Sequence, residues 1–219
     1  THCISSAASD VYKRQDDVKP DFVIVSHASN TIGLVAPVED IFSLAKKYGA
    51  ITLIDMAQTA GIVDCNLGLS TFDFAVFAGH KTLYGPTGIS GFVMNPEVDL
   101  PAVFLGGTGY ESANQDMPES IPEKYEIGTL NIAGIAGLNA ALSWIQEQTV
   151  ERLREVEETN RQHLIDLLEE YDFIKIVGNN PDCDYVGIVS CLIDDISSDS
   201  AGSIFDQQGI ALRLSLIHI

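Results

Sequence analysis

The first half of the chain alternates compact apolar runs with a segment of helical periodicity, which is typical of a sheet of parallel strands. Residues 22–26 (FVIVS) and 51–54 (ITLI) are short and rich in β-branched side chains, and residues 38–48 between them carry apolar side chains at helical spacing. This pattern is a βαβ unit. Further strands are predicted at residues 74–77 and 91–94, with glycine and proline nearby. We therefore predict an α/β fold with a mostly parallel, helix-covered sheet and right-handed crossovers.

The second half has a different order of elements. Residues 96–123 are rich in glycine, proline, serine and acidic side chains and are long for a connection, which is typical of a functional loop. Helices, then strands, then a helix are predicted at residues 132–147, 150–171, 173–177, 186–193 and 200–208. We expect a large domain over residues 16–150 and a small α+β C-terminal domain over residues 151–213.

The two ends of the chain are predicted not to belong to the fold. Residues 5–15 (SSAASDVYKRQ) can be back-translated into the adapter and transposase-end sequence of a common sequencing-library method, and residues 214–219 (LSLIHI) into the same end read from the opposite strand. Complementary matches at both ends indicate translated library sequence. We therefore expect residues 1–15 and 214–219 to be adapter-derived.

Composition excludes several classes of function. The formal net charge of -19 would repel a phosphate backbone, so nucleic acid is not an expected partner. Neither an apolar run long enough for a membrane span nor a signal-peptide pattern is present, so we predict a cytoplasmic protein without a membrane partner. The four cysteines show no metal-ligand spacing with the histidines, so we expect no metal site and reduced, mostly buried thiols.

Polar side chains follow the predicted strands where ligands bind in parallel α/β sheets. Asn30 follows the first strand, Asp55 and Gln58 follow the second, and His80 and Lys81 follow the third. A lysine can form an imine when its surroundings favour the neutral amine, and pyridoxal phosphate is the cofactor that most often uses one. Asp55 would keep the pyridine nitrogen protonated, and Gln58 could donate to the ring hydroxyl oxygen.

Several of these residues have a simpler structural interpretation. His27 and Ser29 are expected to be hydrogen-bonding groups at a strand end rather than catalysts. His80 taken alone would more often be structural than a ligand. Thr129 could be the N-cap of the helix that follows, which is compatible with a functional role. Asp73 is expected on a loop, as a capping or solvated group.

Five motifs together resemble one enzyme family. The runs SHASNTIG, LIDMAQTAG, FAGHKTLYGPTG, EIGTLNIAG and GIALR have the order and approximate spacing of the cysteine desulfurases, within the class V aminotransferase-like family of fold type I pyridoxal-phosphate enzymes. The resemblance covers essentially all of residues 16–213. It implies the fold type I architecture, with a partial large domain that binds the cofactor and the start of the small domain.

The resemblance also implies roles for individual residues. Lys81 would form the Schiff base with pyridoxal 5'-phosphate, and Asp55 would bind its pyridine nitrogen. Gln58 would bind the ring hydroxyl, His80 the phosphate, and Asn30 would lie near the ring and the substrate.

The resemblance implies roles for two further residues, one of which would act on a neighbouring subunit. Thr129 resembles the residue that reaches the phosphate from the neighbouring subunit, which implies a homodimer. Arg213 matches the arginine that opens the loop of the family's active cysteine and would contact the substrate.

The sequence departs from the family in ways that affect activity. Ala78 stands where a serine or threonine commonly bonds the phosphate. The nucleophilic-cysteine loop would follow Arg213, and the cofactor-stacking histidine and phosphate loop would precede Asp16. We expect an inactive internal fragment of an enzyme that converts L-cysteine to L-alanine with persulfide formation, with a possible sulfur-acceptor protein as partner. A selenocysteine lyase, an aminotransferase or a non-catalytic scaffold fragment remain alternatives.

Overall fold

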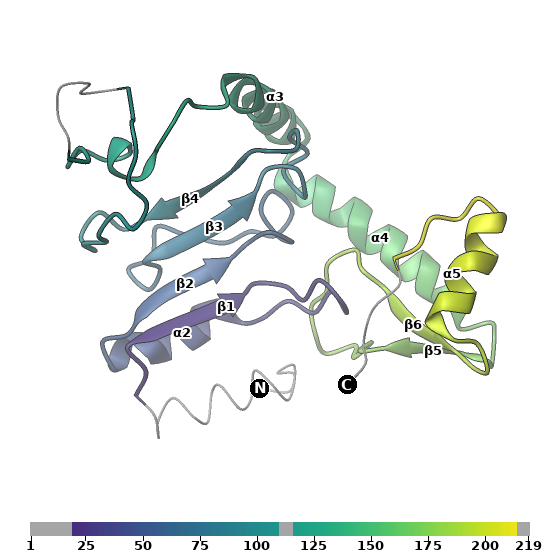
Figure 1. Cartoon of the computed structure of the whole chain (residues 1–219). Helices are drawn as coiled ribbons and strands as arrows, with labels where there is room; N and C mark the ends of the chain where they lie inside the picture. The colour runs from purple at the N-terminus through teal and green to yellow at the C-terminus, as the bar shows by residue number, and fades with distance from the viewer. Residues whose placement is uncertain (1–18, 110–115, 214–219) are drawn as a thin grey trace.

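A four-stranded sheet in the order β1-β2-β3-β4 forms the centre of the computed structural model, which describes residues 19–109 and 116–213 (Figure 1). Its strands are β1 (Phe22–Ser26), β2 (Ile51–Asp55), β3 (Phe74–Ala78) and β4 (Ser90–Met94). The pairs β1–β2 and β2–β3 are parallel, which confirms the predicted α/β sheet. β4 is antiparallel to β3, because residues 79–89 connect them without the crossover helix that a parallel pair needs.

The expected adapter-derived segments lie outside the described residues. Residues 1–18 and 214–219 are both in this category, and so is Cys3. The assignment of residues 1–15 and 214–219 therefore stays a prediction.

Helix α2 (Val38–Lys47) covers one face of the sheet beside β1 and β2. Acidic residues occupy its first turn and basic residues its last, which complements the helix dipole. Gly49, with φ +75°, takes the left-handed conformation just beyond its end. The buried face of the helix consists of Val38, Ile41, Phe42 and Ala45. This face forms the main core with side chains of the sheet, and Phe42 meets Phe72 edge to face at 5.3 Å between ring centroids.

The second half folds as a long helical stretch followed by a small sheet and a helix. The elements are η1 (Glu123–Tyr125), α3 (Ile132–Gln148), α4 (Val150–Leu168), β5 (Ile174–Val177), β6 (Ser190–Ile193) and α5 (Ser198–Gln207). β5 and β6 form an antiparallel pair. The predicted strand at residues 186–193 is confirmed only from residue 190 onward, because residues 184–188 contact the loop after β1 instead.

Side-chain caps set the boundaries of α3 and α4. The side chain of Asn131 accepts a hydrogen bond from Gly134 N at 3.0 Å, so Asn131 is the N-cap of α3. The interpretation of Thr129 as that cap is therefore wrong. Thr149 takes φ 66° between the two helices, and its hydroxyl accepts from Arg152 N at 3.3 Å to begin α4.

Helix α4 joins the two halves of the structure. In Figure 1 it runs from the four-stranded sheet to the unit formed by β5, β6 and α5. Leu153 of α4 packs against the main core and also against a second cluster formed by Ala28, Ile62 and Val186. The predicted domain boundary at residue 151 falls one residue after the start of α4 and stays a prediction. No helix in the described part of the chain is long and apolar enough to cross a membrane.

Large apolar side chains are exposed on several elements. Ile24 on β1 is 63% exposed, Phe104 in the long loop 77%, Ile132 on α3 73% and Leu192 on β6 61%. These four side chains belong to four different parts of the chain, and scattered exposed apolar side chains are ordinary on protein surfaces.

The cysteine thiols are less buried than predicted. Among the described residues none forms a disulfide, Cys65 and Cys183 are partly buried, and Cys191 is exposed. The expectation of mostly buried thiols is therefore wrong for these three. Desolvation, with the charges of Glu39 and Asp64, raises the pKa of Cys65 to about 11, so this thiol is protonated at neutral pH.

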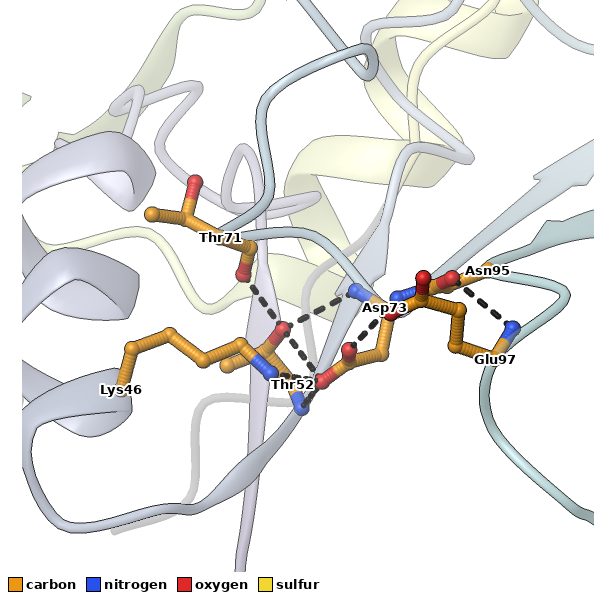
Figure 2. A network of polar contacts seen from close by, with 6 residues as sticks. All are labelled: Lys46, Thr52, Thr71, Asp73, Asn95 and Glu97. Carbon is orange, nitrogen blue, oxygen red and sulfur yellow. Dashed lines mark hydrogen bonds and ion pairs between the residues drawn. The ribbon is translucent and has the colours of Figure 1, made fainter.

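A buried carboxylate fixes the amino-terminal end of the parallel strands (Figure 2). Asp73 is only 4% exposed, which corrects its interpretation as a solvated group. It forms an ion pair with Lys46 of α2, accepts from Thr52 N at 2.8 Å, and accepts from Asn95 Nδ2 at 3.4 Å. Thr52 also donates its hydroxyl to Thr71 O at 2.6 Å. One side chain thereby ties α2, β2, the start of β3 and the end of β4.

The protonation of Asp73 follows from these partners. Burial acts to raise the pKa of Asp73, but the hydrogen bonds that it accepts and the charge of Lys46 outweigh burial and lower the pKa below its usual value. The folded state therefore favours the ionised carboxylate.

We predict that Asp73→Asn lowers the free energy of unfolding at pH 7 by roughly 2 to 3 kcal/mol, because it leaves buried donors without their charged acceptor. Since folding lowers the pKa of Asp73, the stability that its ionised carboxylate contributes is present above about pH 4. That contribution is lost as the pH falls through the folded pKa of Asp73. Urea unfolding measures the free energy of unfolding of variant and wild type at both pH values, and the difference between them should be smaller at pH 3 than at pH 7. Asp99→Asn is the control, because Asp99 is 93% exposed in its pair with Lys124; an equal loss in the control would contradict the prediction.

Candidate active site

The register of the parallel strands brings three chain segments to one edge of the sheet. Ser26 at the end of β1 pairs with Asp55 at the end of β2, and Asp55 pairs with Val76 near the end of β3. In Figure 1 these three strands point toward α4. The polar residues that follow the strands are therefore gathered at the carboxyl edge, as the sequence predicts.

A cavity of about 510 Å³ lies at this edge. Four of the predicted site residues, Asn30, Asp55, Gln58 and Lys81, line it together. Apolar side chains of β1, α2 and the connection between them complete the wall, among them Ile24, Val35, Pro37 and Ile41. The cavity thus combines an apolar surface with a few convergent polar groups, which is the usual character of a small-molecule site.

The turn after β2 orients Asp55 and Gln58. Asp55 Oδ1 accepts a hydrogen bond from Ala57 N at 2.9 Å, which closes an Asx turn. Met56 N donates to Val76 O of β3 at 2.9 Å, so the turn stays attached to the neighbouring strand. A carboxylate has more acceptor sites than this one bond uses, so Asp55 can still accept from a ligand.

The turn after β3 presents Lys81 to solvent beside the cavity. Gly79 N donates to Ile89 O at 3.0 Å, Gly85 N donates to Gly79 O at 2.7 Å, and Tyr84 N donates to Lys81 O at 2.9 Å. The turn is tight, since a Cβ on Gly79 would lie 2.9 Å from Ile89 O. Lys81 is exposed while its backbone is held on both sides.

Three predicted site residues lie outside the walls of this cavity. His80, Thr129 and Arg213 are all exposed, and none of them is among the residues that line it. The fold therefore places the four residues expected around the ring and the amine on one cavity, whereas these three are not among its lining residues, although His80 directly precedes Lys81 in the chain.

A buried histidine joins the ends of β1 and β2 close to the cavity, although it is not one of the residues that line it. His27 is 3% exposed; its Nδ1 lies 2.9 Å from Thr59 Oγ1, and its backbone N donates to Asp55 O at 2.9 Å. This contact agrees with its interpretation as a hydrogen-bonding group at a strand end. Desolvation lowers the pKa of His27 to about 4, with Asp184 raising it and Arg154 lowering it. The imidazole is therefore neutral at pH 7.

Thr59, the hydrogen-bond partner of His27, was not predicted from the sequence. Thr59 is fully buried and follows Gln58 directly. Its place next to Gln58 in the LIDMAQTAG motif could have suggested a role. The sequence alone, however, does not show whether a threonine in a turn is buried against another side chain or exposed to solvent.

The model of the family described as aminotransferase class-V matches residues 9–214. The chain belongs to the class-V aminotransferase family. The match begins and ends inside the segments expected to be adapter-derived, so the two assignments overlap over residues 9–15 and at residue 214.

Curated relatives of this class-V chain carry cysteine desulfurase names. It is 36% identical over 207 residues to a probable cysteine desulfurase of Aeropyrum pernix, covering 89% of this chain and 50% of the relative. It is 31% identical over 201 residues to a cysteine desulfurase of Haloferax volcanii, covering 90% and 47%. The chain thus spans about half the length of the curated relatives that it matches.

Solved structures of cysteine desulfurases share the fold of this class-V chain. The apo enzyme from Thermococcus onnurineus matches with a TM-score of 0.77 and 26% identity, covering 93% of this chain and 52% of that one. The enzyme CsdA from Escherichia coli matches with a TM-score of 0.82 and 24% identity, covering 93% and 51%. The expected fold type I architecture is confirmed.

We predict that the stability of the chain falls as the pH drops from about 6.5 to about 4, because the unfolded histidine binds a proton that the folded His27 does not. The slope from this group is at most about 1.4 kcal/mol per pH unit, or roughly 3 kcal/mol over the window. Chemical unfolding across that window should give a shallower dependence for His27→Gln. His163→Gln, at an exposed position of α4, is the matched control, and an unchanged slope in His27→Gln would refute the assignment.

Proposed function

We propose that the cavity binds pyridoxal 5'-phosphate and that the chain supplies the cofactor site of a cysteine desulfurase. The observation that carries this proposal is that Asn30, Asp55, Gln58 and Lys81 line one cavity. The cysteine desulfurase names of the relatives support it. Because the chain spans about half of those relatives, the activity of a whole protein is part of the proposal.

The donor set fits this cofactor. The cavity presents a carboxylate, an amide and a primary amine beside an apolar wall, which suits a flat ring with a basic nitrogen, a hydroxyl and an aldehyde. Asp55 would hold a proton on the pyridine nitrogen through its charge. Gln58 would donate its amide N–H to the ring hydroxyl oxygen, and Lys81 would hold the cofactor through its amine.

The chain's own residues would then handle the substrate. When bound, the cofactor supplies an electron-accepting ring that stabilises negative charge at the substrate α-carbon. Lys81 would move the α-proton as acid and base, and Asn30 would orient the substrate beside the ring. The apolar wall would limit the access of water to the reacting atoms.

The remaining predicted residues would act at the edge of the site. His80 would bind the phosphate, next to the turn that carries Lys81. Thr129 would reach the phosphate of a neighbouring copy, so we propose a homodimer; its exposure outside the cavity is compatible with that role. Arg213 would contact the substrate.

We propose that the whole protein, rather than this chain by itself, takes sulfur from L-cysteine. L-Cysteine and an enzyme thiol would give L-alanine and a persulfide on that thiol, which balances sulfur and hydrogen. A sulfur-acceptor protein would then take the terminal sulfur. The cytoplasm is the proposed location.

We predict that the chain mixed with pyridoxal phosphate develops a near-visible absorbance band, and that borohydride reduction fixes the cofactor on Lys81. Peptide mass spectrometry after reduction locates the label. Lys81→Ala should lose both the band and the label. Lys47→Ala removes an exposed lysine at the end of α2 and should keep both; label spread over many lysines, unaltered in Lys81→Ala, would overturn the proposed site.

We predict a second, quantitative effect at Asp55. Asp55→Asn keeps an oxygen that can accept from Ala57 N but removes the charge, so the turn should persist while the pairing with the pyridine nitrogen weakens. Charge-assisted hydrogen bonds are worth about 1.5 to 3 kcal/mol, so the dissociation constant for pyridoxal phosphate should rise roughly tenfold or more. Titration followed by absorbance measures it, and an unchanged affinity would exclude Asp55 as the partner of the ring nitrogen.

A further inference from the structure

The loop that carries Asn30 into the cavity is held only partly by its own contacts. The Asn30 loop (residues 29–35) connects β1 to α2. Within it Ser29 N donates to Leu34 O and Gly33 N donates to Ser29 O, each at 2.9 Å. Asn30 itself is exposed at the cavity wall.

A segment from the far end of the chain closes the other side of this loop. The 184–190 segment precedes and begins β6. Three hydrogen bonds join it to the loop, from Val35 N to Asp184 O at 2.9 Å, from Val186 N to Gly33 O at 2.9 Å, and from Ser190 Oγ to Thr31 O at 2.5 Å. The last of these bonds is made to the residue directly after Asn30.

The 184–190 segment is itself anchored on α4. Asp184 forms an ion pair with Arg154 of that helix. Gly187 N donates to Glu157 Oε2 at 3.0 Å. The loop at the cavity is thus tied, through this segment, to the helix that leads into the small domain.

The Asn30 loop and the 184–190 segment also pack closely against each other. Gly33 has φ +75°, and a Cβ there would lie 2.9 Å from Ile188 O and 3.1 Å from Val186 O. Val186 is 2% exposed and packs with Ala28 and Ile62. The backbone of the loop therefore has little freedom to shift away from the segment.

We infer that the 184–190 segment is a positioning element for the cavity, and that Ser190 is a positioning residue that sets the place of Asn30 through Thr31. The inference deepens the proposed function and rests on it for the identity of the ligand. The contacts between the two segments stand whatever the cavity binds. The small domain thereby takes part in the ligand site without lining it.

Hydrogen exchange on the whole chain without added cofactor tests the positioning contact. Ser190→Ala removes the bond to Thr31, so amides of residues 31–35 should exchange about fivefold faster, as expected for one hydrogen bond. Ser190→Thr keeps the hydroxyl and should restore slow exchange. Ser203→Ala is the matched control, because its hydroxyl bonds Asp199 O within α5, in the same half of the chain; it should leave residues 31–35 unchanged.

Cofactor affinity tests whether the contact acts through Asn30. When Asn30 is unchanged, Ser190→Ala should raise the dissociation constant for pyridoxal phosphate several-fold. Ser190→Thr should return the dissociation constant to its wild-type value. In an Asn30→Ala background the same substitution should have no further effect, since a residue that acts through another shows full coupling in a double-mutant cycle. General destabilisation would instead give additive losses.

The outcomes separate the two proposals. Unchanged exchange at residues 31–35 in Ser190→Ala, or an equal change in Ser203→Ala, overturns the positioning role. Additive losses of affinity overturn the route through Asn30. If the wild-type chain binds no pyridoxal phosphate, the proposed function fails, while the exchange result still decides whether Ser190 positions the loop.

Discussion

The parallel register of β1, β2 and β3 is the constraint on which the rest of the structure depends. Pairing of Ser26 with Asp55, and of Asp55 with Val76, sets three strand ends at one level. A slip of one residue in any pair would turn each side chain of that strand to the opposite face. The cavity exists because this register holds, since its polar residues come from three separate strand ends.

The carboxylates at the two edges of the sheet differ in how far their hydrogen-bonding capacity is used within the protein. At the amino edge the carboxylate of Asp73 is buried, and its partners come from α2, from β2 and from Asn95 just after β4. At the carboxyl edge Asp55 makes one local bond, to Ala57 N, and lines an open cavity with Lys81. A satisfied buried charge contributes stability and specificity, whereas polar groups that face a cavity retain capacity for a ligand. The fold thus separates the residues that hold it together from those proposed to act.

Local patterns in the sequence predicted most of the elements, and they singled out four residues that the fold places around one cavity. The helix now seen as α2 follows from apolar spacing, and Asp55, Gln58 and Lys81 follow from their places after strands. Long-range contacts could not be predicted in this way. The bond between Ser190 and Thr31 joins residues 159 positions apart, and no periodicity or motif records it. The exchange of Asn131 for Thr129 as helix cap is a shift of two residues, within the usual error of a predicted boundary.

The contact between the 184–190 segment and the Asn30 loop also explains why β6 is shorter than the apolar pattern predicts. Residues 186–193 carry enough β-branched side chains for one strand, yet Val186 pairs its backbone N–H with Gly33 O and buries its side chain against Ala28. Gly187 N donates to Glu157 of α4 and Ile188 N to Val186 O, so the backbone of residues 186–188 has partners other than β5, and only residues 190–193 pair with β5. One apolar run therefore contacts both the Asn30 loop and β5. Ser190 lies where the contacts change from one to the other: its side chain donates to Thr31 O, and its backbone pairs with β5. Ser190 therefore connects the β5–β6 sheet to the residue that follows Asn30 at the cavity, and the proposed positioning role depends on this contact.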